Sequence, residues 1–139
     1  MSDFEKRVSS VQALVGAALP AEYLSFLRAG PPTYDRAVGV PLRGELWDVT
    51  YFFILSPGPE YRQLDATCRL VSDVLPPFAL PIASDHAGNF FCLFLHGESK
   101  GQVAWWDHER ELDDHHTEPV AASFEAFLSS IEEFKPNDA

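Results

Sequence analysis

Proline and glycine residues divide this chain into short segments, and this division limits the folds that it can adopt. Breaks occur at Pro20, at residues 30–32, at residues 56–59 and at residues 76–77. Proline has a fixed φ angle and no backbone N–H, so helices do not run across such positions. The elements between the breaks are therefore short, and no segment approaches the ~20 consecutive apolar residues that a membrane-spanning helix needs.

Four segments show the apolar spacing of amphipathic helices. A capping box formed by Ser2 and Glu5 opens the first helix, which is predicted over about residues 3–17. The second helix has Pro20 in its first turn and ends at Gly30, before two further prolines. In all four segments, apolar side chains recur every three or four positions and form one buried face. The faces comprise Phe4, Val8, Val11, Val15 and Ala18; Tyr23, Leu24 and Leu27; Tyr61, Leu64, Cys68, Val71 and Leu75; and Phe124, Phe127, Leu128, Ile131 and Phe134.

The middle of the chain is rich in β-branched and aromatic residues, which favour strands. A turn at Arg43–Gly44 joins the first two predicted strands, and loops with glycine and short polar residues join the last three. The predicted strands are residues 38–42, 45–54, 79–83, 89–95 and 102–106.

Helices lead, strands follow, and one helix, behind an N-cap at Ser123, closes the chain. This order predicts an α+β fold with a central, mainly antiparallel sheet of about five strands. N-terminal, middle and C-terminal helices are expected to flank the sheet. The chain is expected to form one domain over residues 1–139, with residues 135–139 as a tail.

Acidic residues outnumber basic ones by 21 to 10, which gives a formal net charge of -11. Nucleic acids and anionic membrane surfaces attract cationic proteins, so neither is expected as a partner. The charge is concentrated near the C-terminus: residues 107–118 hold six acids and one arginine, a net charge of -5. From Glu98 onward, eleven acids and three bases give -8, which leaves -3 for residues 1–97.

The two cysteines, Cys68 and Cys92, lie in apolar surroundings and have no CxxC spacing. A secreted disulfide framework has more cysteines in closely spaced sets, so we expect free, buried thiols in a reducing cytoplasm. The first residues also lack a basic region followed by an apolar run, so no secretory signal peptide is predicted.

Asp85, Gly88 and Asn89 lie in the connection between two predicted strands. One interpretation is structural: Gly88 supplies a positive φ angle, Asp85 accepts hydrogen bonds from the loop, and Asn89 caps the next strand. The other is that a rigid rim presents Asp85 to a partner. The adjacent residues Trp105 and Trp106 point to opposite faces of their strand, so one fits the core while the other needs cover from a helix, a loop or a partner.

Four segments carry a family resemblance. Residues 80–93 read LPIASDHAGNFFCL, and residues 101–109 read GQVAWWDHE. Residues 123–128 read SFEAFL, and residues 19–30 begin with LPAEYLSFL and end in glycine. In their order along the chain, over about residues 19–130, these four segments resemble the signature of the SMI1/KNR4 family, the SUKH superfamily. The signature positions are Pro20, Tyr23, Gly30, Gly88, Asn89, Trp105, Ser123, Phe124 and Phe127.

The resemblance implies a compact α+β domain that binds another protein. For a bacterial member it implies an immunity protein, which neutralises a polymorphic toxin, often a nuclease, by direct binding. The fungal relatives imply the alternative of a regulatory or scaffold protein without a toxin partner. The family brings no catalytic constellation, and the sequence has no GxSxG, Cys–His or Walker pattern, so neither an enzyme nor a cofactor is expected.

The acidic segment, residues 107–118, has three interpretations. One is a solvated loop that aids solubility, and another is a mimic of nucleic-acid charge that fills the cationic cleft of a nuclease. The third is a metal site, because the segment holds His108, His115 and His116, but no HExxH or CxxC frame is present and no metal is expected. The candidate partner-binding residues are Asp85, Trp106, Asp107, His108, Glu109, Glu111, Asp113 and Asp114.

Overall fold

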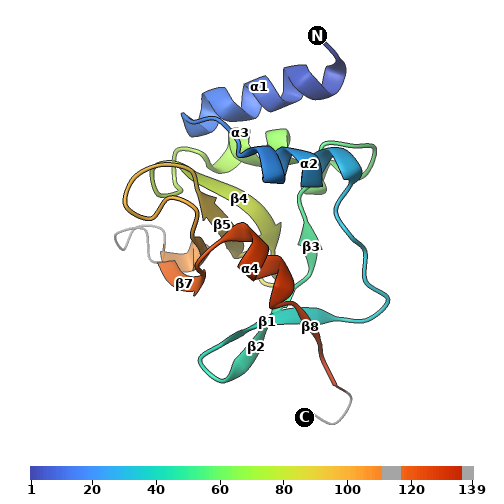
Figure 1. The fold of residues 1–139 in the computed structure, drawn as a ribbon, viewed down its shortest axis with the longest axis vertical. Helices are drawn as coiled ribbons and strands as arrows, with labels where there is room; N and C mark the ends of the chain where they lie inside the picture. Colours follow the sequence, from blue (N-terminus) through green and yellow to red (C-terminus); the bar gives the residue numbers. More distant parts are fainter. Residues whose placement is uncertain (111–116, 136–139) are drawn as a thin grey trace.

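The computed structural model of the chain describes residues 1–110 and 117–135, and for Arg110 it describes the backbone alone. Within these ranges it contains four α-helices and eight strands, and Figure 1 shows their arrangement. The helices are α1 (Asp3–Val15), α2 (Ala21–Ala29), α3 (Leu64–Val71) and α4 (Phe124–Ser129). The strands are β1 (Val38–Leu42), β2 (Glu45–Val49), β3 (Tyr51–Phe52), β4 (Ala79–Ser84), β5 (Phe90–Phe94), β6 (Val103–Trp106), β7 (Thr117–Ala121) and β8 (Glu132–Glu133).

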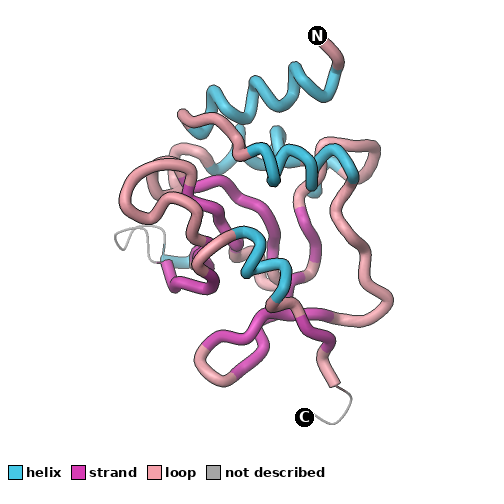
Figure 2. The backbone as a smooth tube through the Cα atoms, viewed as in Figure 1, coloured by secondary structure: helices cyan, strands magenta, loops and turns pink. Residues whose placement is uncertain are grey.

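Two antiparallel sheets form the centre of the fold. The larger sheet has five strands in the order β3-β4-β5-β6-β7, and the smaller has three in the order β2-β1-β8. Figure 2 shows the helices packed around these strands. The predicted α+β class and the antiparallel pairing are confirmed, but the membership of the sheet differs from the prediction. The predicted strand at residues 38–42 lies in the smaller sheet, and β7, which was not predicted, is the fifth strand of the larger one.

The first two helices begin and end at their predicted signals. Ser2 and Glu5 form the capping box at the start of α1, and Gly16, at φ 88°, ends this helix in the left-handed conformation. Pro20 is the N-cap of α2, and Gly30 is its C-cap. The periodicity of the apolar residues and the capping residues therefore place both helices to within two residues.

Two other helices are shorter than predicted. The segment expected as a helix from Tyr61 to Leu75 instead forms a 3-10 turn at Glu60–Arg62 followed by α3. The last helix ends at Ser129, so Ile131 and Phe134 do not continue its apolar face. The chain leaves the helix because residues 132–133 pair with β1 as strand β8.

The predicted strand over residues 45–54 is divided between the two sheets. Its first part, β2, pairs with β1 in the smaller sheet, and its second part, β3, pairs with β4 in the larger sheet. The change occurs at Thr50, whose backbone N–H donates to the carbonyl oxygen of Ser84 at 2.8 Å. This junction joins the two sheets into one domain.

The hydrophobic core lies on both faces of the larger sheet. The main cluster joins all four helices, both sheets and alternate residues of the central strands, such as Phe91, Leu93 and Val103. The intervening residues Cys92 and Trp106 point to the opposite face, where they pack with Leu75 and Ala79. Alternation along a strand thus sends adjacent residues to different clusters.

Candidate partner-binding site

The carboxylate of Asp85 organises the loop between β4 and β5. Its Oδ1 atom accepts hydrogen bonds from the backbone N–H groups of Ala87 and Asn89, both at 2.9 Å. Its Oδ2 atom accepts from Asn89 Nδ2 at 3.0 Å and from Trp105 Nε1 at 3.1 Å. These are the hydrogen bonds of the structural interpretation, and they engage both carboxylate oxygens.

Asn89 extends this network from Asp85 to His108. Because a carboxylate only accepts hydrogen bonds, the amide nitrogen of Asn89 faces Asp85 and its Oδ1 atom faces His108. Oδ1 accepts from the His108 backbone N–H at 3.0 Å and lies 2.6 Å from His108 Nδ1. His108 Nδ1 therefore carries a proton, and the ring directs Nε2 away from the network.

Gly88 provides the backbone conformation that this loop requires. Its φ angle is 88°, in the region that favours glycine, as predicted. A Cβ atom at this position would lie 3.7 Å from the Cε1 atom of His108. This is an ordinary van der Waals distance, so the positive φ angle, and not a lack of space, favours glycine here.

The two adjacent tryptophans have different environments. Trp106 is 2% exposed and packs with Leu75, Ala79 and Cys92, so the prediction that it lies on the partner-binding surface is wrong. The reason is the pleat of β6, which turns this ring toward the cluster beneath α3. Trp105 is half-buried, because its ring packs edge-to-face on Trp47 at a centroid distance of 4.6 Å.

A second polar contact fixes the same loop to β2. Asp48 accepts hydrogen bonds from the Thr50 hydroxyl at 2.6 Å and from the His86 backbone N–H at 2.9 Å, and it lies 2.5 Å from His86 Nδ1. The hydrogen bond to Asp48 raises the pKa of the exposed His86 ring above its ordinary value. Sequence analysis missed this pair, because no local pattern links positions 38 residues apart.

The described part of the acidic segment follows β6. Asp107 accepts a hydrogen bond from the Glu109 backbone N–H at 3.0 Å, and Glu109 is exposed. Neither forms an ion pair with the residues that the structure describes. Glu118 differs, because it forms an ion pair with Arg43 of the β1–β2 turn. The candidates Glu111, Asp113 and Asp114 lie outside the described residues.

The signature residues outside this loop have structural positions. Tyr23 is fully buried and packs edge-to-face on Phe124 at a centroid distance of 5.2 Å, and burial raises the pKa of its hydroxyl. Ser123 is the N-cap of α4, and its hydroxyl accepts from the Ala126 N–H. Phe127, in the same helix, is buried in the core. These residues hold helices on the sheet rather than form a surface.

Both cysteines are free and buried, as predicted. Burial raises the pKa of the Cys68 thiol to about 12 and that of Cys92 further still, so neither is a reactive thiolate. Within residues 1–110 and 117–135, no three His, Cys, Asp or Glu side chains are grouped to hold a metal ion. No helix in these ranges is long and apolar enough to cross a bilayer.

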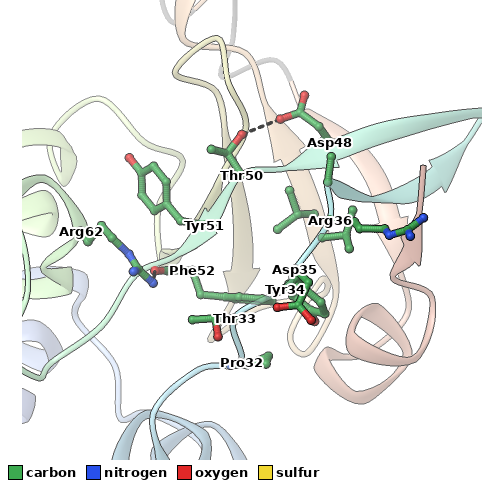
Figure 3. A pocket seen from close by; sticks show the side chains of 13 residues that line it. Pro32, Thr33, Tyr34, Asp35, Arg36, Asp48, Thr50, Tyr51, Phe52 and Arg62 are labelled. Atoms are coloured by element: carbon green, nitrogen blue, oxygen red, sulfur yellow. Dashed lines mark hydrogen bonds between the residues drawn. The ribbon is translucent and has the colours of Figure 1, made fainter. Parts of the chain in front are cut away.

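Sequence analysis also missed a pocket between the segment after α2 and the β2–β3 junction. Its volume is about 430 Å³, and Figure 3 shows its lining. Residues 32–38 form one side, residues 48–52 form the other, and Arg62 lies at one end. Tyr34 lines the pocket, and burial raises the pKa of its hydroxyl.

Comparison with known proteins assigns the fold to a family. A sequence model of the SMI1 / KNR4 family (SUKH-1) matches residues 5–130. The chain belongs to the SMI1/KNR4 (SUKH-1) family. It is also 32% identical over 143 residues to the SPbeta prophage-derived uncharacterized protein YokK of Bacillus subtilis (strain 168), and this alignment covers 91% of the chain and 73% of the relative. No solved structure gives a significant match.

The SMI1/KNR4 match runs from within α1 to the end of α4. It extends further toward the N-terminus than the resemblance over residues 19–130, and it ends before β8. The network of Asp85, Asn89 and His108 therefore lies inside the SMI1/KNR4 region.

Proposed function

We propose that this SMI1/KNR4 protein is an immunity protein that neutralises a polymorphic toxin by direct, non-catalytic binding. Family membership supports a binding role of this kind. The observation that carries the proposal is the concentration of acid in residues 107–118, which hold a net charge of -5. Asp107 and Glu109, at the start of this segment, have no cationic partner among the described residues.

The chemistry of the acidic segment favours a cationic partner. A nuclease binds phosphates with lysines and arginines, so its cleft also attracts a surface of carboxylates. A net charge of -11 adds long-range attraction and speeds the encounter of the two proteins. We therefore propose a nuclease toxin that acts in the cytoplasm, where the immunity protein would reside.

The signature loop contributes rigidity to this surface. Asp85 and Asn89 hold the His108 backbone N–H and ring, and His108 directly follows Asp107. The start of the acidic segment is thus fixed before a partner binds. Such preorganisation lowers the entropy cost of association.

Co-expression tests the proposal. Cells that carry the toxin gene adjacent to the gene for this protein are expected to survive when the protein is present and to die when it is absent. The variant Asp107→Asn/Glu109→Gln is expected to protect less well, because it removes two charges while Asn keeps the acceptor for the Glu109 N–H. The matched variant Glu132→Gln/Glu133→Gln removes the same charge from β8 and is expected to protect fully.

Two results would reject the immunity role. One is death of cells that carry both proteins, and the other is the absence of a toxin gene beside this gene. Either result would favour the regulatory or scaffold role.

A further inference from the structure

Arg62 is a half-buried arginine without an anionic partner among the residues that the structure describes. In the described ranges, the arginines with ion pairs are Arg7, with Asp65, and Arg43, with Glu118. Arg62 has no carboxylate within ion-pair distance there, although the chain has 21 acidic residues. Partly buried arginines are normally paired, because removing a cation from water costs free energy.

The contacts of Arg62 position its guanidinium but leave part of it unused. Its Nη2 atom donates to the Phe52 carbonyl oxygen at 3.2 Å, and its Cζ atom lies 5.7 Å from the centroid of the Tyr51 ring. Its Nε atom is buried and has no hydrogen-bond partner. No hydrogen bond joins its Nη1 atom to the described residues. Of the five N–H donors of this guanidinium, one is used in a hydrogen bond with the described residues.

The surroundings of Arg62 suit a small anionic group. The pocket of about 430 Å³ is lined on the side opposite β3 by a segment that includes Thr33 and Tyr34, two residues with hydroxyl groups (Figure 3). The Asp48 carboxylate in the same lining is engaged by Thr50 and His86. The other charged lining residues, Asp35 and Arg36, have opposite charges and are exposed.

We propose that this pocket binds a carboxylate group, with Arg62 as its counter-ion. Arginine binds carboxylates in a planar, two-bond geometry, and hydroxyl groups such as those of Thr33 and Tyr34 can donate to the same oxygens. The carboxylate comes either from a free small acid or from an acidic side chain or C-terminus of a protein. The site does not depend on the proposed toxin, because its evidence is the unpaired arginine and the pocket.

Titration followed by NMR tests this site. Succinate and the peptide acetyl-Gly-Asp-Gly-Asp-Gly-amide serve as probes of the two sources, and succinamide and the matching Asn peptide are their neutral controls. The backbone amide signals of Thr33 and Phe52, which flank the pocket, are expected to shift in a saturable way with at least one acidic probe. Tighter binding of the peptide would identify a protein carboxylate, and binding of succinate alone would identify a small acid.

Variants locate the binding to Arg62. Arg62→Gln is expected to weaken the affinity at least tenfold, whereas Arg69→Gln, which removes an exposed arginine outside this pocket, is expected to leave it unchanged. Arg62→Lys keeps the charge but not the planar geometry, so a loss of at least threefold is expected even if Arg62→Gln fails to fold. Absence of a saturable shift with either acid, equal shifts with the neutral controls, or unchanged affinity in Arg62→Lys would overturn the proposal.

Discussion

At the scale of single residues, one carboxylate connects three parts of the larger sheet. Asp85 accepts four hydrogen bonds, one each from Ala87 and Trp105 and two from Asn89. Asn89 in turn accepts a hydrogen bond from the His108 ring. Because so many donors depend on this carboxylate, we expect its replacement to lower the stability of the fold. Its effect on partner binding would then act through the position of the acidic segment.

Replacement of Asp85 tests this role. Asp85→Ala leaves the N–H groups of Trp105 and Asn89 without an acceptor, so we expect a loss of about 2–3 kcal/mol in the free energy of unfolding. Asp85→Asn retains one acceptor and is expected to lose about half as much. Urea unfolding measures both, with the exposed Glu109→Ala as a control expected within about 0.5 kcal/mol of wild type. An Asp85→Ala variant of wild-type stability that fails only in binding would contradict the structural role.

The environment of Trp106 gives a second prediction at this scale. In the variant Trp47→Phe/Trp105→Phe, the remaining tryptophan is Trp106, which is 2% exposed. We expect acrylamide to quench its fluorescence weakly in the folded protein and strongly after unfolding in urea. Acrylamide is used because it is neutral, and the acidic protein repels iodide. Equal quenching in both states, with a folded circular dichroism spectrum, would contradict the burial of this ring.

At the scale of elements, an ion pair holds α1 to α3. Arg7 Nε donates to Asp65 Oδ2 at 2.8 Å, and Arg7 Nη2 donates to Asp65 Oδ1 at 2.9 Å and to Gln63 Oε1 at 2.6 Å. The Asp65 side chain is 11% exposed. The hydrogen bond from Arg7 lowers the pKa of Asp65 below its ordinary value of 3.8. This pairing therefore stabilises the fold above that pH, and the contribution is lost as the pH falls through the lowered pKa.

The pH dependence of stability tests this contact. Arg7→Met is expected to lower the free energy of unfolding by about 1–2 kcal/mol near neutral pH, and the difference from wild type is expected to shrink toward pH ~2. Urea unfolding between these pH values measures it. Arg28→Met is the matched control, because the Arg28 guanidinium lies over the Phe4 ring and its effect should not change with pH. A difference for Arg7→Met that stays constant with pH would contradict the role of Asp65.

The elements predicted correctly from the sequence are those whose signals are local. The capping box and apolar spacing of α1 and the Arg43–Gly44 turn of the first hairpin are examples. Strand β8 could not be predicted, because its two glutamates favour no strand and its pairing with Val38 and Gly39 joins distant segments. Gly39 has no room for a side chain, since a Cβ atom there would lie 2.6 Å from the Trp47 carbonyl oxygen and 3.0 Å from the Phe134 ring.

The candidate site also has some features that the local sequence predicts and others that it does not. The hydrogen bonds of Asp85 within its own loop and the positive φ angle of Gly88 follow from the local sequence. The sequence placed Trp105 and Trp106 on opposite faces but could not decide which face is the core. The contact between Asp48 and His86 and the pocket at Arg62 depend on how the two sheets join, which no local pattern encodes.

At the scale of the whole molecule, the central feature is an uneven distribution of charge. Residues from Glu98 onward carry -8 of the net -11, and Arg43 offsets one of these acids, Glu118. Asp107 and Glu109 have no ion-pair partner among the described residues. The net charge of -5 in residues 107–118 is expected to attract a cationic partner to this segment.

The rate of association with the toxin encoded beside this gene tests this account most directly. Stopped-flow measurements from 50 to 500 mM salt are expected to show a steep fall in the association rate constant for the wild-type protein. At low salt, Asp107→Asn/Glu109→Gln is expected to associate several-fold more slowly, whereas Glu132→Gln/Glu133→Gln, with the same net charge, is expected to stay close to wild type. A rate constant that does not change with salt, or an equal loss in both variants, would contradict the account.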